Sequence, residues 1–174
     1  MSELMRKPID MFKSRLNKDL ETATKHWTTT EELSKLLDSN LRYITLPGTR
    51  YIKNGHKKMS EKMPVLMAIA THSNAAASDM NRLARISSEY YEYGLMLTVA
   101  NNANTDSDTL TFLMNNVRVQ NRLEANLRLR ESVAGEVILI WVKDTYRVLI
   151  NESIANHKNA TDKITTRLKK YIRD

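Results

Sequence analysis

The chain has 174 residues, no cysteine, only four glycines and three prolines, and a formal net charge of +7. The lack of cysteine excludes disulfides, a cysteine nucleophile and a thiolate zinc site, and it indicates a reducing compartment. Strand-and-turn folds need glycine and proline at their turns, so the scarcity of both predicts few tight turns and long helices. We expect an all-α protein with at least about 70% of its residues in helices and no sheet.

The N-terminal part of the chain carries an amphipathic helical pattern. From residue 4 to residue 44, apolar side chains recur mostly at steps of three, four or seven. The threonine run and two glutamates at 28–32 are typical of a helix N-cap, so we expect two helices that meet there. Leu46-Pro47-Gly48 is the clearest break. We therefore predict N-terminal amphipathic helices over 1–46 and a long-helix bundle over 47–174, within one structural domain.

The next segment also has helical spacing. Ser60 and Glu61 can start a helix, and Pro64 would then lie in its first turn, where the missing N–H costs little. Apolar side chains follow at steps of three and four between Met80 and Leu97, so one stripe faces a partner helix. Tyr91 would point outward.

The last third of the sequence predicts a very long helix. Residues 101–107 are polar and without periodicity, which indicates a loop whose end is capped by Asp106, Ser107 or Asp108. From residue 109 to residue 171 there is no proline and a single glycine, so we expect one helix of about 60 residues, roughly 90 Å long, in an elongated, coiled-coil-like bundle. The apolar run at 137–142 keeps helical flanks, which favours helix over strand. The predicted helix-interface residues are Tyr90, Tyr93, Leu97, Trp141 and Tyr146.

The positive charge is concentrated in two short segments. Residues 50–62 hold five basic side chains and one acidic, and residues 158–174 hold six basic and two acidic. Such clusters attract anionic membranes and nucleic acids, although solvated helix faces have the same composition. The predicted anion-binding or membrane-binding residues are Arg50, Lys53, Lys57, Lys58, Lys62, Lys163, Arg167, Lys169, Lys170 and Arg173.

No catalytic, cofactor-binding or metal-binding residues are predicted. The four histidines share no helical ligand face, and no HExxH, EF-hand or phosphate-loop motif occurs. His72 lies in an alanine-rich helix and is expected to have a structural or surface role. His56 and His157 stand beside lysines and are expected to be solvated. We therefore predict that the protein is not an enzyme.

Residues 88–172 resemble the helical BAR region of sorting nexins. The resemblance rests on Glu92-Tyr93-Gly94-Leu95-Met96-Leu97 at a helix end, the polar loop through Asp106-Ser107, and Val142-Lys143-Asp144-Thr145-Tyr146-Arg147-Val148-Leu149-Ile150 in a second helix. It implies a BAR-like dimer that binds membranes. In that family a third long helix follows, and a phosphoinositide-binding module precedes. The chain is then a fragment, uses the helices before Pro47 in the bundle, or shares only its long helices with the family.

Three functions follow as alternatives. The first is a non-enzymatic helical scaffold that forms a homodimer and binds an anionic membrane surface from the cytoplasm as a peripheral protein. The second is a nucleic-acid-binding helical protein that uses the same cations on phosphate without sequence preference. The third is a helical protein–protein module in which charge only provides solubility.

Overall fold

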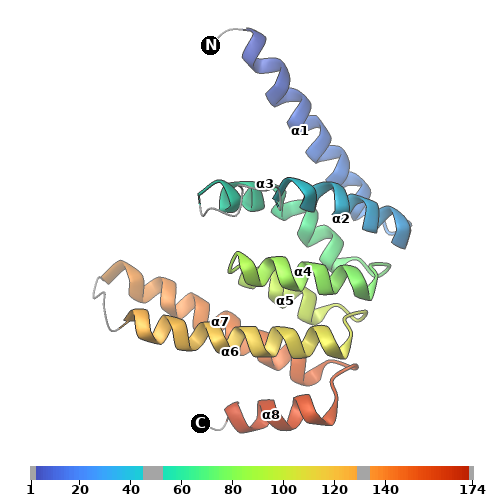
Figure 1. The fold of residues 1–174 in the computed structure, drawn as a ribbon. Helices are drawn as coiled ribbons and strands as arrows, with labels where there is room; N and C mark the ends of the chain where they lie inside the picture. Colours follow the sequence, from blue (N-terminus) through green and yellow to red (C-terminus); the bar gives the residue numbers. More distant parts are fainter. Residues whose placement is uncertain (1–2, 45–52, 129–133, 173–174) are drawn as a thin grey trace. The chain divides into compact units, whose positions relative to one another are not determined.

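The computed structural model consists of α-helices joined by turns in the regions that it describes (Figure 1). It describes the backbone of residues 3–44, 53–128 and 134–172, and the side chains of residues 14–42, 44, 57–117 and 145–169. Within those backbone ranges it holds eight α-helices and no strand, and the helices include more of the chain than the predicted share. The all-α prediction is confirmed.

The first compact unit, Met1–Asp79, is called unit 1. It contains α1 (Glu3–Thr24), α2 (Thr30–Ile44) and α3 (Lys53–Thr71), and α3 packs on both α1 and α2. The boundary between the two compact units therefore falls after residue 79. Fully buried side chains from α2 and α3 form its core: Leu33, Leu37, Ile44, Met59, Val65, Leu66 and Ile69.

The start of α2 follows the sequence prediction. The Glu32 amide donates to Thr29 Oγ1 (3.3 Å), while the Thr29 amide and hydroxyl donate to Glu32 Oε2 (2.8 and 2.9 Å). The two residues thus satisfy each other's polar groups at the helix end, as in a capping box. These two donors lower the pKa of the Glu32 carboxyl. The prediction of two helices that meet near residue 28 is confirmed.

The start of α3 differs from the prediction. The helix begins at Lys53 and not at Ser60, so Pro64 lies inside it and not in its first turn. A proline within a helix removes one backbone donor and clashes with the preceding turn, which bends the helix. Figure 1 shows α3 change direction along its length.

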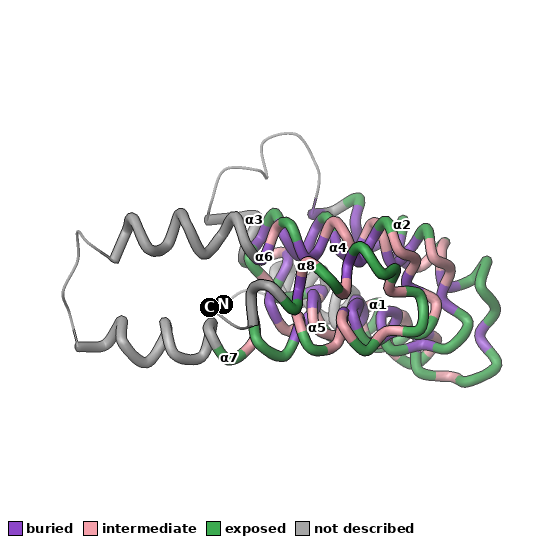
Figure 2. The backbone as a smooth tube through the Cα atoms, turned by 90° about the horizontal axis from the view of Figure 1, so that it is seen from below, coloured by how far each residue is buried: buried purple, intermediate pink, exposed green. Residues whose placement is uncertain are grey.

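The second compact unit, Met80–Asp174, is called unit 2. It contains most of α4 (Ala77–Glu89), together with α5 (Tyr93–Asn101), α6 (Ser107–Arg128), α7 (Ala134–Asn156) and α8 (Asp162–Ile172). α7 packs on α5, α6 and α8. Buried and exposed positions alternate along these helices (Figure 2). The core of the unit includes Leu95, Met96, Val99, Leu110, Leu113, Ile150, Ile154 and Leu168.

The prediction of a single helix over residues 109–171 is wrong. That stretch holds parts of three helices, α6, α7 and α8, none of them longer than 23 residues. α7 ends at Asn156 in a turn that contains neither glycine nor proline. The run at 137–142 is helical, as expected, because it lies within α7.

Candidate binding surfaces

Four of the connections between helices are built by the same hydrogen bonds. Each turn has four residues. The backbone amide of its first residue donates to the carbonyl of the residue three positions earlier (3.1–3.3 Å), and the backbone amide of its fourth residue donates to the carbonyl of the first (2.9–3.2 Å). A side chain then caps the next helix in three of them, through Thr29, Asp106 and Thr161. The predicted loop is thus confirmed over 102–106, one residue shorter at each end than expected, with Asp106 as its cap. The four turns are 25–28, 72–75, 102–105 and 157–160, called the first to the fourth turn.

In unit 1 the second turn is attached to the first by two side chains. His72 is buried, and its Nε2 lies 2.9 Å from the Lys25 carbonyl oxygen. Its Nδ1 accepts the Asn74 amide at 3.0 Å, so we assign the ring hydrogen to Nε2, which donates to the carbonyl. The Asn74 side chain donates to the Thr28 carbonyl at 3.0 Å. We call this pair of side chains the His–Asn clamp.

Unit 2 contains the same clamp between its third and fourth turns. His157 Nε2 lies 2.8 Å from the Asn102 carbonyl oxygen, and His157 Nδ1 accepts the Asn159 amide at 3.1 Å. The Asn159 side chain donates to the Thr105 carbonyl at 2.8 Å. The expectation that His157 is solvated is therefore wrong, since the ring is half-buried and both of its nitrogens are used. The structural role expected for His72 is confirmed.

The clamp has a signal in the sequence that the analysis above missed. Ile-Ala-x-His-x-Asn-Ala occurs at 69–75 and again at 154–160. Comparison of the sequence with itself detects such internal repeats, whereas examination of each histidine alone does not. With both ring nitrogens occupied, neither histidine is available as a general base or a metal ligand.

The predicted basic residues of unit 1 have different environments. Lys57 is exposed and Lys58 is half-buried, whereas Lys62 is only 4% exposed. Burial lowers the pKa of Lys62 and Arg15 lowers it further, while Asp19 and Glu61 act in the opposite direction. Lys62 is thus removed from the predicted anion-binding set, because a buried ammonium group cannot reach an extended surface.

The side chains of Arg50 and Lys53 lie outside the described residues.

Replacement of Lys62 by methionine should stabilise unit 1. At pH 7, Lys62→Met is expected to raise the free energy of unfolding by about 1 kcal/mol, because it removes the cost of a buried charge. The folded-state pKa is below the ordinary 10.5, so the unfolded chain binds more protons between the two values and wild-type stability rises with pH there. The advantage of the variant should therefore shrink as pH approaches 10.5, in urea titrations at several pH values.

Lys57→Met, at an exposed position of α3, is the control and should change the unfolding free energy by less than about 0.5 kcal/mol. An equal effect of both substitutions, or a loss of stability in Lys62→Met, would contradict the prediction.

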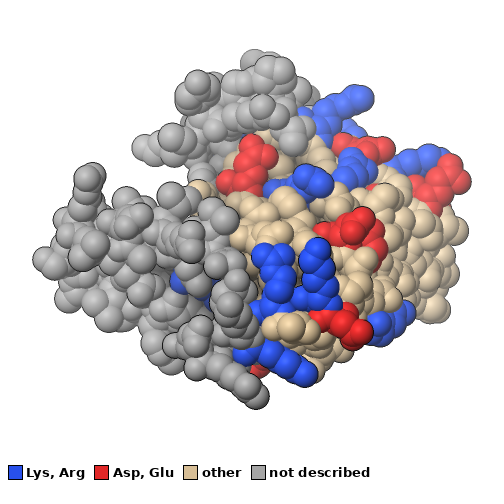
Figure 3. All heavy atoms as spheres, turned by 60° about the horizontal axis from the view of Figure 1, so that its bottom comes forward, with Lys and Arg blue, Asp and Glu red and all other residues tan. Residues whose placement is uncertain are grey.

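The basic residues of α8 form an exposed face. Lys163 and Lys169 are exposed and Arg167 is half-buried, whereas Ile164 and Leu168 are buried against the rest of unit 2. Figure 3 brings the bottom of Figure 1 forward, and on that face Lys and Arg side chains lie beside Asp and Glu side chains. The side chains of Lys170 and Arg173 lie outside the described residues.

The predicted helix-interface residues divide into two groups. Tyr90 and Tyr93 are buried, as expected, while Leu97 and Tyr146 are half-buried. The Trp141 side chain lies outside the described residues. Tyr91, expected to point outward, is 51% exposed and has a left-handed backbone with φ 58°.

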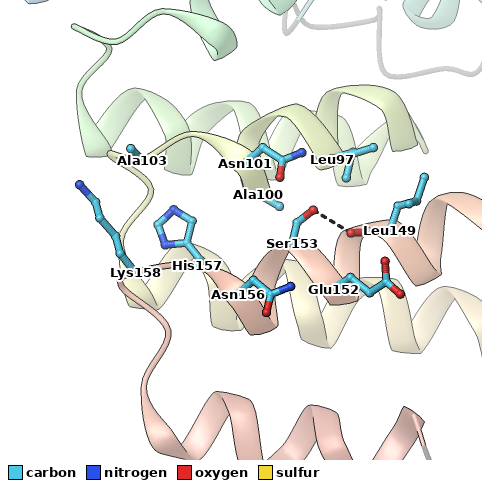
Figure 4. Close-up of a pocket in the computed structure, with 10 residues that line it drawn as sticks. All are labelled: Leu97, Ala100, Asn101, Ala103, Leu149, Glu152, Ser153, Asn156, His157 and Lys158. Atoms are coloured by element: carbon cyan, nitrogen blue, oxygen red, sulfur yellow. Dashed lines mark hydrogen bonds between the residues drawn. The ribbon is translucent and has the colours of Figure 1, made fainter.

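A groove of about 500 Å³ lies between α5 and α7 (Figure 4). The groove is open at the surface, and Leu149 contributes an apolar side chain that is 41% exposed. Sequence analysis did not identify this groove, because its lining comes from two segments that are distant in the sequence. It is lined by Leu97, Ala100, Asn101, Ala103, Leu149, Glu152, Ser153, Asn156, His157 and Lys158.

The described residues show no group of His, Asp or Glu side chains that could hold a metal ion. In the same part of the chain, no helix combines the length and the apolar character needed to cross a bilayer. Comparison with protein-family models, curated proteins and solved structures gave no match to this chain.

Proposed function

We propose that this chain is a non-enzymatic helical scaffold whose exposed basic side chains bind an anionic membrane surface. One observation carries the proposal: within the described residues, no carboxylate pairs with Lys57, Lys58, Lys163, Arg167 or Lys169. Elsewhere in unit 1, Lys25 and Lys35 pair with glutamates at 2.8 and 2.6 Å. Cations that the fold does not use are available for an external anion.

Electrostatic attraction determines how much each of these side chains contributes to the free energy of membrane binding. Each basic side chain near an anionic leaflet adds about 1 kcal/mol, so the three cations of α8 together provide about 3 kcal/mol. The exposed face of α8 has no large apolar side chain among the described residues, which favours binding by charge over insertion into the bilayer. A contribution of this size is weak for one chain and becomes useful when copies are combined. We therefore include homodimerisation in the proposal.

Co-sedimentation with vesicles tests the membrane part. Wild-type protein should pellet with vesicles of phosphatidylcholine and phosphatidylserine and not with phosphatidylcholine alone. Removal of two charges in K163Q/K169Q should weaken binding roughly 30-fold, as two side chains at about 1 kcal/mol each require. K25Q/K35Q removes the same charge from side chains that are already paired, and it should bind like the wild type.

Binding to both vesicle types, or an equal loss in the two variants, would contradict the proposal. A mobility shift of single-stranded DNA at moderate salt, without vesicle binding, would favour the nucleic-acid alternative. Sedimentation equilibrium at several protein concentrations tests homodimerisation separately. A monomer at all concentrations would contradict the proposed homodimer.

A further inference from the structure

The groove between α5 and α7 carries opposite charges at its two ends. Glu152 and Lys158 are both exposed, and Figure 4 shows them toward opposite ends of the lining. Asn101 of α5 and Asn156 of α7 lie between them, and no hydrogen bond among the described residues engages either side-chain amide. Leu97 and Leu149 add apolar surface.

The repeated clamp shows that the fold does not require these polar groups. Alignment of the two clamp motifs equates α7 with α3, since both helices end one residue before the clamp histidine. Apart from the clamp histidine, which both units share, the α7 side of the groove has four polar residues, and all four are replaced by other uncharged residues in unit 1. Met67, Ala68, Thr71 and Ser73 take the places of Glu152, Ser153, Asn156 and Lys158.

The same turn hydrogen bonds form with either set of side chains. The two charges and the Asn156 amide on the α7 side are therefore not needed to form the clamp.

We propose that this groove binds an extended peptide segment of a partner protein. A basic side chain of the peptide pairs with Glu152, an acidic side chain pairs with Lys158, and an apolar side chain between them contacts Leu149. The carboxamides of Asn101 and Asn156 each offer a donor and an acceptor, which match the N–H and C=O groups of a peptide backbone. The volume of about 500 Å³ lies within the range of ligand sites.

The spacing of the charges sets the length of the recognised segment. Glu152 and Asn156 are one turn apart, about 6 Å along the helix, and Lys158 lies two residues further. A total of roughly 10 Å corresponds to about three residues of extended chain, but side chains three positions apart on such a chain point to opposite sides. The basic and acidic side chains should therefore be four positions apart, about 13 Å, with the apolar side chain midway on the same side. The length of lysine and glutamate side chains covers the difference. This site is separate from the basic face of α8, so the proposal does not depend on membrane binding.

Isothermal titration with short blocked peptides tests the proposal. Acetyl-Lys-Ala-Leu-Ala-Glu-amide and the reversed sequence cover both chain directions, and at least one should bind more tightly than peptides with two lysines or two glutamates. E152M and K158S introduce the residues found in unit 1, so folding should persist while affinity for the mixed-charge peptide falls about tenfold, as the loss of one charged contact requires.

A change in peptide preference distinguishes a role of Glu152 in binding from a role in stability alone. E152K makes both ends of the groove positive, so this variant should prefer the peptide with two glutamates, by about tenfold over the mixed-charge peptide. Circular dichroism should show unchanged helix content in each variant. Absence of binding to every peptide, or an E152K variant with the wild-type order of preference, would overturn the proposal.

Discussion

His72→Ala is expected to lower the free energy of unfolding by about 2 kcal/mol. The substitution removes two hydrogen bonds made by a ring that is only 7% exposed, and each is worth about 1 kcal/mol net. The Lys25 carbonyl keeps the amide of Thr28, whereas the Asn74 amide loses its acceptor. Urea denaturation followed by circular dichroism measures the change.

Asparagine is the informative replacement at this position. In the third turn Asn102 occupies the place of His72, and its Oδ1 accepts the Asn104 amide at 2.9 Å. His72→Asn should therefore recover about half of the loss, because it restores that one bond. Ser78→Ala, at an exposed position of the same unit, should change stability by less than about 0.5 kcal/mol. If His72→Ala behaves like Ser78→Ala, the clamp does not stabilise the fold.

Truncation of the isoleucine before each clamp should have the largest effect of all. Ile69 and Ile154 are both fully buried, and the carbonyl of each accepts the amide of the clamp histidine. Ile69→Ala and Ile154→Ala should each lower the unfolding free energy by about 2–5 kcal/mol, because a buried side chain is lost and a cavity remains.

The matched valine variants provide the scale for this comparison. Ile69→Val and Ile154→Val should cost about 0.5–1.5 kcal/mol, since they remove only one methyl group. A similar loss at both positions is expected because they are equivalent in the repeat. Effects under about 0.5 kcal/mol at either site would show that the units are not built alike.

The features that the sequence predicted correctly depend on neighbouring residues. Thr29 and Glu32 are three residues apart and hold each other in the capping box, so the start of α2 follows from a local motif. Asp106 caps the next helix by the same kind of contact, with the amide of Thr109. Helical periodicity, which is also local, predicted the fold class.

The features that the sequence analysis missed depend on distant residues or on unusual turns. Scarcity of glycine and proline predicted few tight turns, but histidine, asparagine and threonine side chains build them here by bonding to the backbone. His72 and Lys25 are far apart in the sequence, as are His157 and Asn102, so periodicity does not reveal their contact. The burial of Lys62 likewise arises in the packed unit 1, where α3 contacts α1.

The position of each clamp along the chain has a consequence for synthesis. Every group of the His–Asn clamp in unit 1 lies between Lys25 and Asn74. All the residues of this clamp are therefore translated before those of the fourth turn. Domains generally fold as units as they emerge from the ribosome, N-terminal first. Unit 1 can therefore close its own clamp while Asn159, which closes that of unit 2, is still to be added to the nascent chain.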